Sequence, residues 1–132
     1  MKKLSFISSI FVAFVCLMLT SCAGEQISKA IEVANKQCPM TLAPGLTMEK
    51  ISDEGQNVTY HYLVDENRYV MDDIKAAYEA PGANSQLVAD MRSDHDTAEF
   101  FDLVKAAGKN IQLTFTGSNG NSFNVVIENS EF

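Results

Sequence analysis

Basic residues are scarce in this 132-residue sequence, which has 10 lysines and arginines against 17 aspartates and glutamates. A net charge of −7 argues against nonspecific nucleic-acid binding and against attraction to acidic lipid headgroups. Histidine and cysteine occur only two and three times. The chain has no glycine-rich phosphate loop, no CxxC pair and no recognisable Ser-His-Asp spacing. No cofactor and no catalytic constellation are therefore expected.

The length and the distribution of apolar residues exclude several architectures. The chain is too short for a TIM barrel or a Rossmann enzyme, and its hydropathy is not that of a multi-pass membrane protein. Apolar residues, 46% of the whole, are concentrated in the first 21 positions. The remainder has the size and composition of one domain with one core.

The first 21 residues have the pattern of a secretory signal peptide. Lys2 and Lys3 form a basic start, and an apolar run covers residues 4–19. As a helix this run would span about 24 Å, less than the roughly 30 Å of a bilayer core, and no basic cluster follows it. A signal peptide is predicted, with a permanent N-terminal anchor helix as the alternative. Loss of the two lysines would change the net charge from −7 to −9.

The end of this leader, Leu19-Thr20-Ser21-Cys22, resembles a bacterial lipobox: an aliphatic residue, two small residues and a cysteine. The resemblance implies that cleavage falls between Ser21 and Cys22, that Cys22 carries a diacylglycerol thioether and that its new α-amine is acylated. Several acyl chains on one residue suffice for stable anchoring. Because Ala23 and not aspartate follows, the resemblance implies the outer membrane, and the lack of an acidic run favours its periplasmic leaflet.

The expected organisation is a signal peptide (1–21), a lipidated tether (22–25) and a single domain (26–132). Cys38 is then the only thiol of the domain, since Cys16 lies in the leader, so an intramolecular disulfide is excluded. Pro39 directly after it and the apolar residues nearby favour a buried Cys38. An intermolecular disulfide is the open alternative.

Hydrophobic periodicity predicts helices and hairpins in alternation. Helical spacing predicts helices over residues 26–37 and around 70–78, another turn or two around 87–91, and a final helix that ends at Gly108. Asp96 and Glu99 fit a capping box at the start of that last helix. Alternating residues predict strands over 47–52 and 57–64, joined by a turn at 53–56.

The C-terminal hairpin has two possible registers. A two-residue turn at Asn119-Gly120 would place Phe115 opposite the polar Asn124. A three-residue loop over 118–120, with Gly120 left-handed, pairs Phe115 with Phe123 instead and is predicted because it keeps apolar residues together. The predicted fold class is α+β: a two-layer domain in which a four-stranded antiparallel sheet of two hairpins packs on helices on one face.

Two segments, Ala34–Met40 and Val58–Val64, resemble a family of small, functionally uncharacterised bacterial envelope proteins. The shared pattern is a helix that ends in an asparagine-containing turn with a proline, followed by a strand with tyrosines two residues apart. The resemblance extends loosely over most of the mature chain and is weakest in the middle helices. It implies the fold and an envelope location, and it supplies no catalytic residue.

Two groups of polar residues are candidates for a functional site. One is a partner surface on the polar face of the sheet, made of His61, Gln112, Thr114, Thr116 and Asn124. The other is the acidic loop Asp94-His95-Asp96, whose carboxylates are candidate ligands of a divalent cation. The loop lacks the ligand spacing of an EF-hand, so a solvated loop without metal is favoured.

The favoured function is noncatalytic. The anchor, the small size and the missing catalytic groups indicate an envelope accessory protein, inhibitor or immunity-type protein that binds a protein partner through the polar sheet face or a free sheet edge. The alternative is a small metal-dependent or hydrolytic enzyme that uses His61 or the Asp94-His95-Asp96 loop. The sequence leaves open the partner, the oligomeric state and the biological process.

Overall fold

Four α-helices and five strands form the part of the chain that the structure, a computed structural model, describes: residues 23–132. The helices are α2 (Ala23–Asn35), α3 (Met71–Glu79), α4 (Ala83–Arg92) and α5 (His95–Ala106). The strands are β1 (Met40–Ala43), β2 (Leu46–Glu54), β3 (Asn57–Val64), β4 (Asn110–Gly117) and β5 (Ser122–Ile127), followed by the 3-10 helix η1 (Asn129–Glu131). The predicted signal peptide, cleavage site and lipidation site lie outside the described residues. Among the described helices, none is long and apolar enough to cross a membrane.

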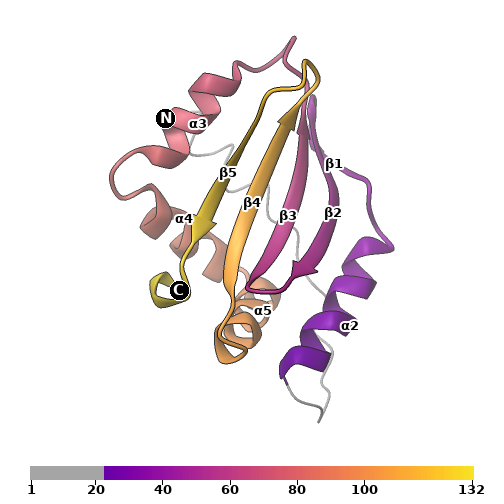
Figure 1. The fold of residues 1–132 in the computed structure, drawn as a ribbon, viewed down its shortest axis with the longest axis vertical. Coiled ribbons are helices and arrows are strands. Elements are labelled where there is room, and N and C mark those ends of the chain that lie inside the picture. Colours follow the sequence, from indigo (N-terminus) through magenta and orange to yellow (C-terminus); the bar gives the residue numbers. More distant parts are fainter. Residues whose placement is uncertain (1–22) are drawn as a thin grey trace.

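The strands form one sheet in the order β1-β2-β3-β4-β5 (Figure 1). Neighbours are antiparallel except β3 and β4, which run parallel. The α+β class is confirmed, but the prediction of four antiparallel strands is wrong in two respects. The pattern misses β1, a strand of four residues between Pro39 and Pro44. The inner strands are parallel because the connection through α3, α4 and α5 returns the chain to the end of the sheet where β3 began.

The hydrophobic core lies between the helices and one face of the sheet. Tyr60, Tyr62 and Phe115 on that face are no more than 1% exposed, and they belong to the same cluster as Phe100 and Phe101 of α5. Along β4 buried residues alternate with half-buried ones. The helices flank and underlie the sheet in Figure 1, so its polar face is open.

The β4 and β5 hairpin has the predicted register. Phe115 pairs with Phe123, and their rings stack with centroids 4.9 Å apart. The Gly117 N–H donates to the Asn121 carbonyl at 2.7 Å, and Gly120 has a φ of 91°, which closes the predicted three-residue loop. Apolar pairing on one face therefore determines the register.

The helices differ from prediction at three places. α2 begins at Ala23 and ends at Asn35, whereas the predicted helix covers residues 26–37. The segment around 87–91 belongs to a ten-residue helix, α4. The N-cap of α5 is Asp94 and not the predicted Asp96: the Asp94 carboxylate accepts hydrogen bonds from Thr97 N–H at 2.9 Å and from the Thr97 hydroxyl at 2.7 Å. Asp96 lies in the first turn, where a carboxylate still interacts favourably with the helix dipole.

Candidate functional site

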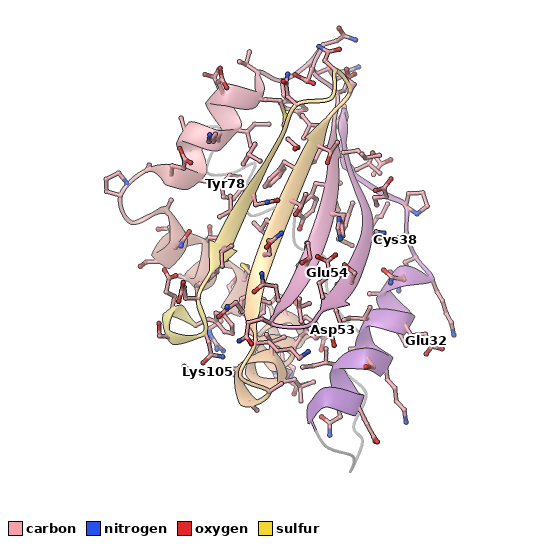
Figure 2. All side chains as sticks on the ribbon, viewed as in Figure 1. Glu32, Cys38, Asp53, Glu54, Tyr78 and Lys105 are labelled. Carbon is pink, nitrogen blue, oxygen red and sulfur yellow. The ribbon has the colours of Figure 1, made fainter. Side chains whose placement is uncertain are left out.

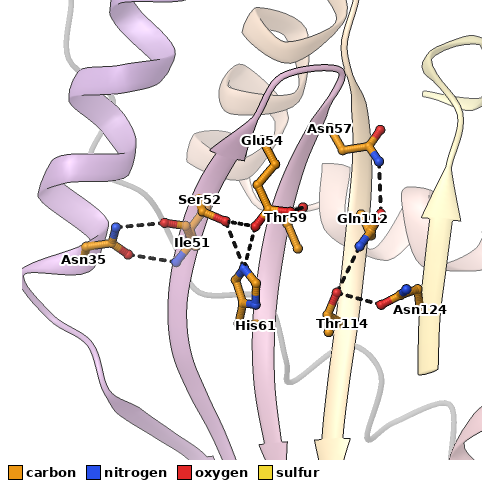
Figure 3. A network of polar contacts seen from close by, with 10 residues as sticks. All are labelled: Asn35, Ile51, Ser52, Glu54, Asn57, Thr59, His61, Gln112, Thr114 and Asn124. Carbon is orange, nitrogen blue, oxygen red and sulfur yellow. Dashed lines mark hydrogen bonds and ion pairs between the residues drawn. The ribbon is translucent and has the colours of Figure 1, made fainter. Parts of the chain in front are cut away.

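The open face of the sheet carries a chain of hydrogen-bonded side chains across β3, β4 and β5 (Figure 3). Asn57 donates to Gln112 at 2.9 Å, and Gln112 donates to Thr114 at 3.1 Å. Thr114 in turn donates to Asn124 on β5 at 2.8 Å. Three residues of the predicted partner surface thus belong to one network, and Thr116 lies half-buried further along β4 on the same face.

His61 belongs to a second group on this face, together with Ser52 and Glu54 of β2. The His61 Nε2 atom lies 2.8 Å from Ser52 Oγ and 3.1 Å from Glu54 Oε2. Ser52 donates its hydroxyl proton to Glu54 Oε2 at 2.5 Å, and the buried Thr59 donates to Glu54 Oε1 at 3.3 Å. The hydrogen bond from Ser52, and after it the contact with His61, hold the pKa of Glu54 below its usual value of 4.5.

This second group contains the residue types of a hydrolase triad in a different arrangement. In a triad one imidazole nitrogen takes the serine proton while the carboxylate holds the other nitrogen. Here Ser52 and Glu54 approach the same nitrogen of His61, and the serine proton is directed to the carboxylate. The arrangement does not fit proton transfer from Ser52 to a His61 ring oriented by Glu54.

The Asp94-His95-Asp96 loop forms the start of α5. Hydrogen bonds from Thr97 hold the pKa of Asp94 below its usual value of 3.8. His95, whose side chain is 84% exposed, lies 3.0 Å from the Glu99 carboxylate. Within residues 23–132, no three His, Cys, Asp or Glu side chains are arranged to hold a metal ion. His95 stands at the helical side of the domain and His61 on the open sheet face, so the two histidines do not form one site.

An unpredicted contact ties α2 to the edge of β2 (Figure 3). The Asn35 side chain donates to the Ile51 carbonyl and accepts from the Ile51 N–H, both at 2.8 Å. A neighbouring strand would make the same two bonds, but β1 pairs with β2 only as far as Met48. The amide therefore continues the sheet edge where β1 no longer covers it. Sequence spacing offers no sign of this pairing.

Cys38 lies in the loop between α2 and β1 (Figure 2) and is half-buried, where the sequence favours a buried thiol. Its Sγ atom donates to the Ala34 carbonyl at 3.6 Å. Partial burial raises the pKa of the thiol above 9.0, so the neutral, weakly nucleophilic form prevails at pH 7.

A cavity of about 450 Å³, the β5 groove, opens between α3 and the start of β5. Its lining residues are Glu66, Tyr69, Val70, Met71, Asp72, Lys75, Asn119, Asn121, Ser122 and Phe123. Glu66 fixes the adjoining loop because its carboxylate accepts from Asn119 N–H at 2.7 Å and from the Asn121 side chain at 2.9 Å. The groove lies at the opposite end of the sheet from the start of α2 (Figure 1). Sequence periodicity does not predict it, since its two walls are far apart in the chain.

No protein-family profile and no curated protein sequence matches the chain. Among solved structures, a pilotin of the type 2 secretion system of Vibrio vulnificus aligns with a TM-score of 0.57 and 12% identity, over 83% of this chain and 90% of that chain. A Pseudomonas aeruginosa protein described as secreted aligns with a TM-score of 0.62 and 12% identity, over 83% and 91%. A type II secretion system pilotin of Vibrio cholerae aligns with a TM-score of only 0.48 at 11% identity, over 99% and 96%. The first two alignments show a shared fold.

Proposed function

We propose that this chain is a lipid-anchored, noncatalytic accessory protein of the bacterial envelope, of the pilotin kind, that binds a protein component of a secretion system. The observation that carries the proposal is the fold shared with a pilotin over 83% of this chain and 90% of the other. The lipobox ending at Cys22 supports it, because a lipid anchor would hold such a protein at a membrane. The arrangement of Ser52, Glu54 and His61 supports a binding role over nucleophilic catalysis.

The proposal also includes an orientation at the outer membrane, with the domain in the periplasm. Because α2 begins at Ala23, a lipid on Cys22 would hold the start of α2 next to the bilayer. The β4 strand, with eight residues, spans about 26 Å towards the opposite end. The β5 groove would therefore face away from the membrane, where a large partner has access (Figure 1).

Lipidation is tested by Cys22→Ser in cells supplied with labelled palmitate. We expect this variant to keep the size of the precursor and to incorporate no label, because the acceptor thiol is absent. Cys38→Ser is the matched control and should be processed and labelled normally. Continued labelling of the Cys22→Ser variant would refute the proposed site.

The partner is tested by crosslinking in intact cells, purification of the anchored protein from outer membranes and mass spectrometry. We expect an outer-membrane subunit of a secretion system to be enriched over a Cys22→Ser sample. Deletion of the gene should also reduce the assembled form of that subunit in the outer membrane. Absence of any reproducible envelope partner would contradict the proposed function.

A further inference from the structure

We infer that the free edge of β5 at Ser122 and Asn124 binds an extended segment of the partner protein, which adds to the sheet as a sixth strand beside α3. The inference rests on the proposed function, because it identifies the surface that would hold the partner. The segment that we infer has alternating apolar and basic residues.

The backbone of β5 has unused hydrogen-bonding groups on its outer side. Residues of an antiparallel strand alternate between those bonded to the neighbouring strand and those whose N–H and C=O point away from it. Gly117 bonds to Asn121, so Phe123, two residues further along, is also bonded to β4. Ser122 and Asn124 alternate with these residues, and their backbone groups therefore point away from β4. Within residues 23–132, no hydrogen bond reaches these outward groups.

The second half of the β5 edge, at Val126, is already covered by α4. Asn84 of α4 donates from its side chain to the Val126 carbonyl at 3.5 Å and to the Glu131 carboxylate at 3.1 Å. An added strand is therefore confined to the first half of β5. This half is the part that borders the β5 groove.

The β5 groove has room for side chains of an added strand. Its volume of about 450 Å³ falls in the range of roughly 300–1,000 Å³ typical of ligand sites. Phe123 points towards the core side of the sheet and lines the groove opposite Val70 and Met71 of the α3 side. Val70 is 61% exposed, so an apolar side chain entering here would bury a surface that is open in the free protein.

The acidic character of the groove and of the domain indicates which kind of segment binds. Glu66 and Asp72 line the groove against one ammonium group, that of Lys75. The domain as a whole carries nine more carboxylates than basic groups once the two leader lysines are removed. A segment with basic residues is therefore favoured. A second copy of this chain is disfavoured, because pairing of two β5 edges would bring the two acidic grooves together.

The probe for the test is an end-blocked hexapeptide of alternating lysine and valine. A hexapeptide of alternating lysine and proline has the same charge but cannot pair as a strand, and it serves as the control. The protein is the full lipidated chain in detergent micelles, titrated with each peptide and followed by amide NMR. We expect saturable binding of the valine peptide alone, with the largest shifts and new exchange protection at Ser122 and Asn124.

Two variants locate the binding. Ser122→Pro removes an outward N–H without breaking the hydrogen bonds between β5 and β4. It should weaken binding of the valine peptide about tenfold, whereas Ser122→Ala should leave the affinity unchanged. Val70→Ser, at an exposed position that does not endanger folding, should weaken it severalfold. Leu63→Ser, which truncates an equally apolar residue that is 40% exposed on the open face, should leave binding unchanged.

Three results would overturn the inference: equal binding of the proline peptide, shifts centred on the open face, or peptide-free dimerisation through β5. The partner capture described above, repeated with Ser122→Pro, separates the inference from the proposed function. If Ser122→Pro and the unchanged protein capture the partner equally, the inferred binding at the β5 edge is refuted but the proposed function is not. No partner with the unchanged protein would count against the function, while the peptide titration would still decide whether the edge binds a strand.

Discussion

Replacement of Asn35 with alanine tests whether one side-chain amide closes the edge of β2. The change removes two hydrogen bonds of 2.8 Å to the Ile51 backbone, at a half-buried position that β1 does not reach. Each such bond contributes about 0.5–1.5 kcal/mol net, and the backbone groups of Ile51, a residue that is 1% exposed, regain only part of that from water. We therefore expect Asn35→Ala to lower the free energy of unfolding by about 2 kcal/mol.

Urea denaturation at neutral pH measures this loss directly. The midpoint should fall with little change in the slope, because the surface exposed on unfolding stays the same. In thermal denaturation the same loss corresponds to a fall in melting temperature of roughly 10 °C. Asn67→Ala, at an exposed position in the loop after β3, is the control and should change stability by less than about 0.5 kcal/mol. Equal effects of the two substitutions would refute the structural role of Asn35.

Asn35→Asp separates the two hydrogen bonds. The introduced carboxylate can accept from the Ile51 N–H, but it cannot donate to the Ile51 carbonyl and repels it. When protonated it can donate again, so the folded state raises its pKa above the unfolded value. The stability gained from protonation is then fully present below the unfolded pKa and is lost as pH rises through the folded pKa. Relative to Asn35→Ala, the aspartate variant should gain stability as pH falls; a pH-independent difference would contradict this reasoning.

Three further predictions concern single contacts. The lowered pKa of Glu54 contributes stability that is present above its unfolded value of 4.5 and is lost as pH falls through the folded pKa. Glu54→Gln should therefore destabilise the protein at pH 7 and lose this effect in urea titrations once the pH lies below the folded pKa. Asp94→Ala should cost about 1 kcal/mol in urea denaturation, whereas Asp96→Ala should cost clearly less; the reverse order would restore Asp96 as the N-cap. Gly117→Ala would place a Cβ atom on the Glu66 carboxylate and should cost about 1–3 kcal/mol by thermal denaturation, and an unchanged melting temperature would show that the loop yields freely.

The C-terminal hairpin could be predicted in detail, but the order of the strands could not. On β4 and β5, only one register keeps Phe115 and Phe123 on the same side as their apolar neighbours, so local pattern is sufficient. Periodicity states which face a residue occupies and not which strand lies beside it. The parallel pairing of β3 with β4 depends on where the helical connection over 65–109 returns to the sheet, and no local pattern encodes that. β1 is too short for alternation to be visible.

The candidate site shows the same limit at the level of single residues. Alternation around Tyr60 and Tyr62 assigns His61 to the polar face correctly. The turn-like composition of residues 53–56 predicts that its partner Glu54 lies in a turn, whereas β2 continues through Glu54. An irregularity between Met48 and Lys50 also shifts the register of β2 against β3, and it brings Lys50 opposite His61. The alternation of apolar and polar residues does not reveal a bulge of this kind. The contacts of His61 therefore could not be predicted from the sequence.

The hydrogen bonds of the open sheet face also make it a less favourable binding surface for a partner than the free edge of β5. Docking on that face must either preserve or break contacts such as Thr114 to Asn124, and each polar group left unpaired costs about 1–3 kcal/mol. Among residues 23–132, the outward backbone groups of Ser122 have no such contacts to lose, and a strand added there would gain hydrogen bonds. The edge also borders the β5 groove, which supplies apolar burial that the open face largely lacks. For a partner of the proposed kind, the free edge of β5 therefore offers more free energy of binding than the polar face does.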